Sequence, residues 1–371
     1  MRSARTIAVV TGSRAEFGLL RTIMSAIAEH PDLGLRTIVT GTHLLAPDRT
    51  IEEVAGAFPV EAIVPMHDVD DRTRLGDAAA TGRGLLGLAD ALRRLAPDVV
   101  LVLGDRIEAF AAAAAGSIGG VRVAHVHGGD RAEGVADEAM RHAITKLAHI
   151  HLPATAASAR RIIAMGEPED RVHVVGSPAL DGLGAIPALD DGAYDALGRP
   201  EVVVLLHPCG RDDAIEHDVA ARVLRAATAR GRVLALHPNH DPGRSGIVAA
   251  ITEWSGPSAT HLARPRFIGL LRRASVLVGN SSAGLIEAAA VPVRVVNVGP
   301  RQAGRERPEH VVDVPDEDEA GLARAIDAAV GSPRLGSVGH PYGDGASGRR
   351  VASVLATFDP RVHDVRKHNA Y

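Results

Sequence analysis

The sequence predicts an α/β protein made of two Rossmann-like domains that face each other across a cleft. Three observations lead to this prediction. Short, β-branched apolar runs alternate with helix-forming stretches along most of the 371 residues, as in parallel sheets with helical crossovers. A stretch rich in Gly, Pro and Asp, residues 181–200, interrupts this alternation near the middle of the chain. The same alternation then resumes, so we expect domains at residues 1–178 and 179–371.

The elements of the first half follow from runs of Val, Ile and Leu for strands and from high helix propensity for helices. Strands are expected at residues 7–10, 36–40, 63–65, 99–103, 121–126, 150–153 and 172–175. Helices are expected at about residues 19–29, 71–95, 109–115, 137–149 and 156–165. Residues 82–87 match the pattern GxGxxG, but they lie inside a predicted helix rather than after a strand, so we do not interpret them as a dinucleotide site.

The second half repeats the same alternation. Strands are expected at residues 202–206, 233–236, 276–278, 293–298 and 310–314. Helices are expected at about residues 214–229, 247–254, 267–273, 284–290, 319–330 and 348–357. Each strand–helix–strand unit predicts a right-handed crossover and therefore parallel pairing of the strands.

Composition excludes several classes of function. The net charge is −4 and aromatic residues make up 2% of the chain, so a basic surface or stacking platform for nucleic acid is not expected. Apolar runs are too short to span a bilayer. The single cysteine, Cys209, excludes an internal disulfide and fits a reducing compartment. The chain runs directly into a strand without a signal peptide, and we expect a cytoplasmic protein.

Polar residues follow two neighbouring strands of the predicted first sheet. Asp105 and Arg106 come directly after residues 99–103, and a run from His125 to Asp130 ends the next strand. Ligands of doubly wound sheets bind beyond the carboxyl ends of the strands. We therefore expect a site where these residues meet.

The helix after this run carries charges at helical spacing. Asp137 and Arg141 are four residues apart, as are Glu138 and His142, which places each pair on adjoining positions of one face. The alternative is a solvated face with ordinary helix pairs; charge beside two strand ends favours a site. Lys146 on this helix is one of two lysines in an arginine-rich chain, which suggests a role that arginine does not fill.

Two turns between a strand and a helix could bind an anion. Residues 11–18 contain glycine and Arg14, and residues 279–284 contain Ser281 and Ser282. Free N–H groups and hydroxyls there could hold a diphosphate; the alternatives are an ordinary βα loop for the first turn and plain N-capping for the second. A nucleophilic serine elbow has a different glycine spacing. Glu287 could accept ribose hydroxyls or favour the helix N-terminus.

Histidines and arginines complete the candidate residues. His43, His127, His207 and His237 close predicted strands, where they could contact phosphate or move protons. No recognisable ligand spacing accompanies them, so we expect no metal. Arginines at 14, 301 and 305 come from both halves and suit a nucleoside diphosphate, whereas the acids come from the first half. This division predicts a nucleotide held by the second domain and chemistry done by the first.

Seven motifs together resemble the UDP-N-acetylglucosamine 2-epimerase family in its hydrolysing branch. They are VTGSRAEFG at 10–18, VTGTH at 39–43, GDR at 104–106, HVHGG at 125–129, RHAITKL at 141–147, GNSSAG at 279–284 and RQAGR at 301–305. The resemblance implies a glycosyltransferase-B-like fold in which a final helix, at about residues 346–358, packs back on the first domain. It also implies a homodimer or homotetramer and no cofactor.

The resemblance implies elimination of UDP from a UDP-sugar to give 2-acetamidoglucal, followed by hydration to free N-acetylmannosamine. The matching positions suggest acid–base residues and the residues that position them: Asp105, Asp137, Glu138, His127, Asp130, Arg141 and His142. They suggest as ligands of the UDP-sugar Arg14, Phe17, His43, Arg106, Lys146, His207, His237, Asn239, Phe267, Ser281, Ser282, Gly284, Glu287, Arg301 and Arg305.

Two positions depart from the patterns of the family. His127 stands where one group carries glutamate, as it does in a second, hydrolysing group. Asp130 stands where that second group carries glutamate. UDP-N-acetylglucosamine is the first expected substrate, and a UDP-2,4-diacetamido-2,4,6-trideoxy-glucose is the second. A non-hydrolysing 2-epimerase, a glycosyltransferase on the same fold and a non-catalytic UDP-sugar sensor are the remaining alternatives.

Overall fold

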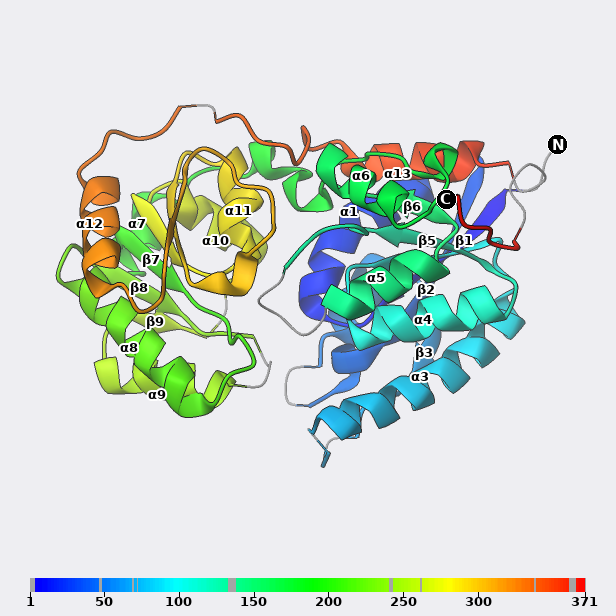
Figure 1. Cartoon of the computed structure of the whole chain (residues 1–371), viewed down its shortest axis with the longest axis horizontal. Helices are drawn as coiled ribbons and strands as arrows, with labels where there is room; N and C mark the ends of the chain where they lie inside the picture. Colours follow the sequence, from blue (N-terminus) through cyan, green and yellow to red (C-terminus); the bar gives the residue numbers. More distant parts are fainter. Residues whose placement is uncertain are drawn as a thin grey trace. The chain divides into compact units, whose positions relative to one another are not determined.

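The structure is a computed structural model that describes residues 4–46, 49–68, 70–71, 73–132, 138–239, 243–260, 262–336, 338–359 and 365–370. The chain forms two compact units (Figure 1). The first contains Met1–Asp130, Asp137–Asp181 and Tyr342–Tyr371, and the second contains Arg131–Ala136 and Gly182–Pro341. The last part of the chain therefore belongs to the first unit.

The first unit is built on a six-stranded parallel sheet in the order β3-β2-β1-β4-β5-β6. Its strands are β1 (Arg5–Thr11), β2 (Leu33–Thr40), β3 (Val60–Val64), β4 (Val99–Leu103), β5 (Arg122–Val126) and β6 (Ile150–Leu152). The order reverses between β1 and β4, which are paired in parallel. Such a switch point places the loops after β1 and β4 at the usual ligand-binding edge of the sheet.

Helices cover both faces of this sheet (Figure 1). They are α1 (Arg14–Glu29), α2 (Ile51–Ala57), α3 (Arg74–Leu95), α4 (Ile107–Ile118), α5 (Glu138–Leu147), α6 (Ala156–Ala164) and α13 (Ser347–Thr357), with turns η1 (Gly41–Leu44), η2 (Glu169–Arg171) and η3 (Pro178–Leu180). One hydrophobic core contains residues of α1 and α13, among them Leu20 and Leu355. The other combines α3 and α4 around Leu88 and Ala112. The predicted return of the final helix to the first domain is confirmed.

The second unit has a parallel sheet in the order β12-β11-β10-β7-β8-β9. Its strands are β7 (Val202–Leu205), β8 (Val233–Leu236), β9 (Ser258–Ala259), β10 (Val276–Gly279), β11 (Arg294–Val298) and β12 (Val311–Val314). Its helices are α7 (Asp191–Asp195), α8 (Asp213–Thr228), α9 (Arg244–Trp254), α10 (Arg264–Leu271), α11 (Ser282–Leu285) and α12 (Glu319–Val330), with turns η4 (Leu183–Ala185), η5 (Glu287–Ala290) and η6 (Pro300–Gln302). Valines of the strands pack against α8, α9 and α12.

Two predicted elements differ from the structure. The strand expected at residues 172–175 is an isolated bridge between His151 and Val172, because Gly176 follows with a φ of +83° and turns the chain away. The helix expected to run to Ala290 is broken at Ile286, where the backbone has φ −99° and ψ −69°. Residues 82–87 lie inside α3, which agrees with their exclusion as a nucleotide motif.

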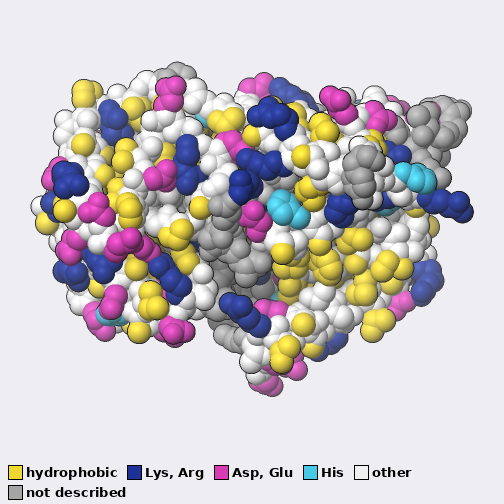
Figure 2. Space-filling model, viewed as in Figure 1, with side chains coloured by type: hydrophobic (Ala, Val, Ile, Leu, Met, Phe, Trp, Pro, Cys, Tyr) yellow, Lys and Arg dark blue, Asp and Glu magenta, His cyan; other side chains and the backbone are white. Residues whose placement is uncertain are grey.

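The surface carries charged side chains of both signs, interspersed over the visible face of each unit (Figure 2). Among the residues that the structure describes, there is no helix with both the length and the apolar content needed to cross a bilayer.

Two glycines allow loops at the switch point to pack against one buried side chain. A Cβ added to Gly12 would lie 2.5 Å from Cγ of Glu108. A Cβ added to Gly41 would lie 2.4 Å from the carbonyl oxygen of Gly12, and the φ of Gly41 is +62°. Both glycines belong to motifs that end strands, so close approach of backbone to Glu108 explains why glycine stands there.

We predict that Gly12→Ala destabilises the protein by about 1–3 kcal/mol, because the added methyl group overpacks the site of Glu108. Gly82→Ala is the matched control, since nothing lies within 4 Å of its added Cβ and alanine favours a helix interior by up to about 1 kcal/mol. Urea unfolding of both variants measures the free energies of unfolding. Equal effects of the two substitutions would contradict the packing at Gly12.

Candidate active site

The end of β4 is joined to α5 by an ion pair. Gly104, with a φ of +78°, turns the chain after β4, and Asp105 follows. Arg141 on α5 donates from Nη2 to Oδ2 of Asp105, and the two side chains are 5% and 20% exposed. The nearly buried guanidinium thus has an anion beside it. The carboxylate of Asp105 is held at the carboxyl edge of the sheet and keeps some exposure to solvent.

The other predicted pair on α5 is also formed. Nε2 of His142 lies 3.6 Å from Oε1 of Glu138, and both side chains are partly exposed, at 32% and 21%. The four-residue spacing therefore predicted this contact correctly. Asp137 lies outside the described residues. Since Arg141 is buried on Asp105, the alternative of a wholly solvated helix face does not hold for this helix.

His127 and Asp130 belong to a buried hydrogen-bond network. Nδ1 of His127 lies 2.7 Å from Asp130, and Nε2 lies 3.0 Å from the hydroxyl of Ser177. Ser158 donates to the second oxygen of Asp130 at 2.7 Å. The chain Ser177–His127–Asp130 has the connectivity of a serine triad. Ser177 is only 1% exposed and accepts a hydrogen bond from the backbone N–H of Ala179, so this network fixes the loop and contains no accessible nucleophile.

The sequence-based prediction missed two buried carboxylates at the switch point. Glu16 accepts a hydrogen bond from the N–H of Gly12 at 2.7 Å, and Glu108 is fully buried between Arg106 and His67. Nε of Arg106 lies 3.4 Å from Glu108. A lone carboxylate inside the alanine-rich stretch 107–118 was the available signal for Glu108.

The two carboxyl groups have opposite pKa shifts. Burial raises the pKa of Glu16 to about 8, and the negative charge of Glu108 acts in the same direction. Burial also opposes ionisation of Glu108, but the charge of Arg106 and the hydrogen bond of His67 outweigh it and hold its pKa below the ordinary value. The site therefore contains one neutral and one ionised carboxyl group at neutral pH.

Three residues predicted as ligands of the UDP-sugar have partners within the first unit. Phe17 is 1% exposed and packs edge-on against the rings of His43 and Phe58. Both ring nitrogens of His43 are occupied, at 2.9 Å from Thr11 and 2.6 Å from Thr50, and burial lowers its pKa to about 4. Both side chains are thus packed in the interior, and their contacts with a ligand stay predictions. The third residue, Lys146, lies 2.6 Å from the carboxylate of Glu167.

The loop after β1 does expose a cation. Arg14, at the start of α1, is 46% exposed and lies 3.5 Å from Glu53. Such an exposed pair is weak, so Arg14 can exchange this partner for a phosphate at little cost.

Asn280 organises the corresponding edge of the second unit. Its side chain accepts from the N–H of His207 at 2.7 Å and donates to the carbonyl of the same residue at 2.8 Å. Its own carbonyl accepts from Gln302 at 2.9 Å and from Arg301 at 3.3 Å. Asn280 thereby joins the ends of β7 and β10 to η6, a function that its place in the 279–284 motif did not reveal.

The partly exposed ring of His207 lies in this network and is neutral at neutral pH. Burial, together with the charge of Arg301, lowers its pKa to about 3. Nδ1 accepts from the backbone N–H of Asn239 at 3.2 Å, so the proton of the neutral ring lies on Nε2. A neutral Nε2–H group is a hydrogen-bond donor suited to a phosphate oxygen.

The helix that follows the serine turn is shorter than predicted. Ser281 accepts from the N–H of Ala283 at 3.3 Å and caps α11, which has four residues. This is the N-capping alternative, and anion binding by Ser281 and Ser282 stays a prediction. Gly284 belongs to α11 and Glu287 begins η5.

The other predicted ligands lie on separate elements of the second unit. Phe267 lies on α10 and His237 follows β8. Arg305 donates to the carbonyl of Arg131 at 3.2 Å.

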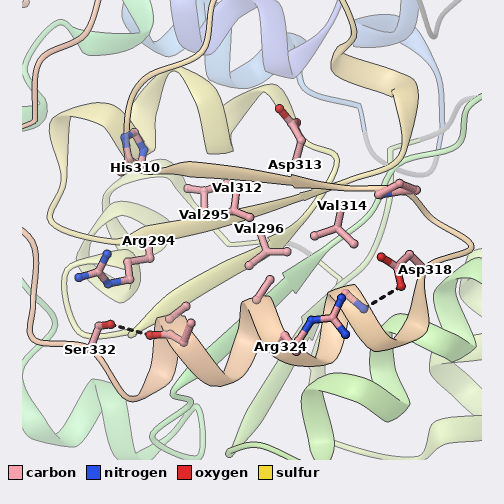
Figure 3. A pocket seen from close by; sticks show the side chains of 15 residues that line it. Arg294, Val295, Val296, His310, Val312, Asp313, Val314, Asp318, Arg324 and Ser332 are labelled. Carbon is pink, nitrogen blue, oxygen red and sulfur yellow. Dashed lines mark hydrogen bonds between the residues drawn. The ribbon is translucent and has the colours of Figure 1, made fainter.

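A pocket of about 470 Å³ lies elsewhere in the second unit, between β11, β12 and α12 (Figure 3). Val296, Val314, Arg324 and Asp318 line it, and the residues predicted for the site do not. Across the described ranges, His, Cys, Asp and Glu side chains form no group of three or more suited to a metal ion.

Comparison with known proteins identifies the family. The family model for UDP-N-acetylglucosamine 2-epimerase matches residues 25–356. The chain belongs to the UDP-N-acetylglucosamine 2-epimerase family. The resemblance predicted from the seven motifs is confirmed.

Curated members of this epimerase family match the chain over most of its length. The chain is 36% identical over 379 aligned residues to the UDP-N,N'-diacetylbacillosamine 2-epimerase (hydrolyzing) of Legionella pneumophila, with 99% of this chain and 100% of that protein covered. It is 31% identical to a UDP-N-acetylglucosamine 2-epimerase of Neisseria meningitidis, with 83% of each chain covered.

Solved structures of the epimerase family share the fold. The UDP-GlcNAc 2-epimerase of Neisseria meningitidis bound to UDP-GlcNAc has a TM-score of 0.78 at 17% identity, covering 94% of this chain and 99% of that one. The enzyme of Methanocaldococcus jannaschii in complex with UDP-GlcNAc and UDP has a TM-score of 0.76, with the same identity and coverage. The predicted glycosyltransferase-B-like fold is confirmed.

We predict that the free energy of unfolding falls as pH rises because Glu16 ionises, and that Glu16→Gln abolishes this dependence. Folded Glu16 holds its proton up to about pH 8, whereas an ordinary glutamate loses it near 4.5. Between these values the folded state binds more protons than the unfolded state, so the free energy of unfolding falls as pH rises, by at most about 1.4 kcal/mol per pH unit. Glutamine cannot ionise, and its amide oxygen can still accept from Gly12.

Urea unfolding at several pH values between 4.5 and 8 tests this dependence. Glu29→Gln, at the exposed end of α1, is the control and should follow the wild type. Equal slopes for the wild type and Glu16→Gln would contradict the neutral state of Glu16.

Proposed function

We propose that the protein is a hydrolysing UDP-sugar 2-epimerase, which releases UDP and a free 2-acetamido sugar inverted at C2. The observation that carries the proposal is the arrangement at the end of β4, where Asp105 pairs with Arg141 of α5, the helix that also carries the Glu138–His142 pair. Membership of the 2-epimerase family and the hydrolysing relative in Legionella support the same reaction.

The proposed reaction has two steps. A base removes the proton from C2, the electrons of that bond form a C1–C2 double bond, and the C1–O bond breaks as its electrons leave with UDP. Water then adds its oxygen to C1 and gives up one proton to a base, while an acid delivers a proton to C2 from the opposite face. The C2 proton is weakly acidic, so both steps need placed acid and base groups. Asp105 and the Glu138–His142 pair are the described candidates, and Asp137 stays a prediction.

The leaving diphosphate needs hydrogen-bond donors and positive charge. In the proposal the second unit supplies them from the Nε2–H group of His207 and from Arg301, beside the turn of Ser281 and Ser282, while Glu287 accepts ribose hydroxyls. His127 and Asp130 act by fixing their loop, because their polar atoms are already occupied within the buried network. Association into a homodimer or homotetramer is a further part of the proposal.

Two substrates remain candidates. The 36% identity to the Legionella diacetylbacillosamine enzyme over nearly the whole of both chains favours a UDP-2,4-diacetamido-2,4,6-trideoxy-glucose. UDP-N-acetylglucosamine, the first choice from the motifs, is supported by the Neisseria relative at 31% identity. The two sugars differ at C4 and C6, away from the C1 and C2 atoms that react, so the same mechanism serves both.

Both nucleotide sugars should be supplied in D2O, with the products separated by chromatography and the sugar analysed by NMR. We expect free UDP and a 2-epimerised sugar carrying deuterium at C2. Asp105→Asn should lower kcat by at least about a hundredfold, as for loss of an acid–base group. Asp90→Asn, which changes an exposed pair with Arg93 on α3, should leave kcat unchanged.

Each alternative gives a different result. A UDP-linked epimer as the final product would indicate non-hydrolysing epimerisation. Dependence of UDP release on an added acceptor would indicate a glycosyltransferase. Binding without turnover, unaffected by Asp105→Asn, would indicate a sensor. A released sugar without deuterium at C2 would exclude the elimination route.

A further inference from the structure

The two lysines of the chain meet at one buried carboxylate in the first unit. Glu167 is 1% exposed at its side chain, and Nζ of Lys146 lies 2.6 Å from its Oε1. Nζ of Lys367 lies 2.7 Å from Oε2, and Nε2 of His151 lies 3.0 Å from the same atom. Lys146 comes from α5, Lys367 from the end of the chain and His151 from β6. Three separate segments therefore converge on Glu167.

The charges in this cluster are compensated. Burial opposes ionisation of Glu167, but hydrogen bonds from His151, Lys146 and Lys367 outweigh it and lower its pKa to about 2. Burial lowers the pKa of His151, so at neutral pH its ring is neutral and serves as a hydrogen-bond donor. Removing one ammonium group would leave a buried carboxylate short of a partner, which is costly in a protein interior.

Lys367 also caps the end of α5. Its ammonium group donates to the carbonyl of Ala148 and, at 3.4 Å, to that of Thr145. The last carbonyls of a helix have no partner within the helix. A cation at this end satisfies them and interacts favourably with the helix dipole. Lys367 therefore links the final turn of α5 to Glu167.

The residues around Lys367 form a strap, which we define as Val365–Ala370. His149 donates from Nε2 to the carbonyl of Val365 at 3.0 Å. Lys146 donates to the side chain of Asn369 at 2.8 Å. The N–H of Ala370 donates to the carbonyl of Gly166 at 2.8 Å. The strap thus bonds to the segment after α5 and to the segment after α6, and the end of the chain lies close to β6 (Figure 1).

The candidate site and the strap contact opposite ends of the short helix α5. Arg141, near the start of α5, pairs with Asp105, and Lys146, near its end, pairs with Glu167. At 1.5 Å per residue, these two positions are about 7.5 Å apart along the axis. A small axial shift of a rigid helix at its strapped end would therefore move Arg141 by a similar distance.

We propose that the C-terminal strap is a positioning device for the candidate site: Lys367 and Glu167 fix α5 where Arg141 reaches Asp105. Lys367 and Glu167 are positioning residues in this inference and do not touch substrate. The structural part depends only on contacts within the first unit. The effect on turnover rests on the proposed function.

The first test is hydrogen–deuterium exchange in the full-length chain carrying Lys367→Met, which keeps the apolar stem and removes the ammonium group. Exchange should increase in residues 138–147 and stay unchanged in α1 and α4. His368→Ala is the matched control, because His368 is an exposed residue of the same strap. Unchanged exchange of α5 in Lys367→Met would overturn the proposal whether or not the protein is an epimerase.

The second test is kinetic and applies to the UDP-sugar that the wild type converts. Lys367→Met should lower kcat by about tenfold to a hundredfold with little change in KM, as for a slight misplacement of a catalytic group. Lys367→Arg should restore most of the rate, since it returns the cation. In an Arg141→Met background the strap variant should cost nothing further.

The kinetic outcomes are decisive in both directions. Unchanged kcat in Lys367→Met, or losses that multiply with Arg141→Met, would overturn the positioning role. A wild-type protein that converts no UDP-sugar would contradict the proposed function and leave the exchange result as the test of the strap. If Lys367→Met does not fold, Asn369→Ala removes one strap contact and should give the same changes at smaller amplitude.

Discussion

The arrangement of the first unit depends on the burial of Arg141, whose charged guanidinium group is removed from water. A guanidinium that is 5% exposed needs an anion close by, and Asp105 provides it. Breaking a buried pair of this kind typically costs about 3–5 kcal/mol, because the remaining charge stays in the interior. The pair therefore does more than place a carboxylate at the end of β4: it also fixes the helix that carries Glu138 and His142.

Other buried polar groups hold the loops around this pair. Glu108 lies against the backbones of Gly12 and Gly41 and thereby ties the loop after β1 to the loop after β2. His127 and Asp130 close the loop after β5 through Ser177 and Ser158. Each of these loops is thus stabilised by side chains that are buried and hydrogen-bonded. A site built in this way is preorganised, because its polar groups have little freedom left to lose when a ligand binds.

The sequence predicted most of the fold and only part of the site. Parallel strands have continuous apolar runs, so both sheets and the polar residues after β4 and β5 could be recognised. Helical spacing correctly paired Glu138 with His142, but it cannot show that Arg141 reaches Asp105 on another element. The spacing of residues also does not show which polar or aromatic side chains are buried. Phe17 and His43 were therefore predicted as ligands of the substrate although both are buried, whereas the buried carboxyl groups of Glu16 and Glu108 were not recognised.

A double-mutant cycle on Asp105 and Arg141 tests the central claim most directly. Urea unfolding should be measured for Asp105→Asn, Arg141→Met and the double variant. If the pair fixes α5 to β4, the double variant should be less destabilised than the sum of the single variants, with a coupling energy of at least about 1 kcal/mol. Single effects that add to within about 0.5 kcal/mol would contradict the account.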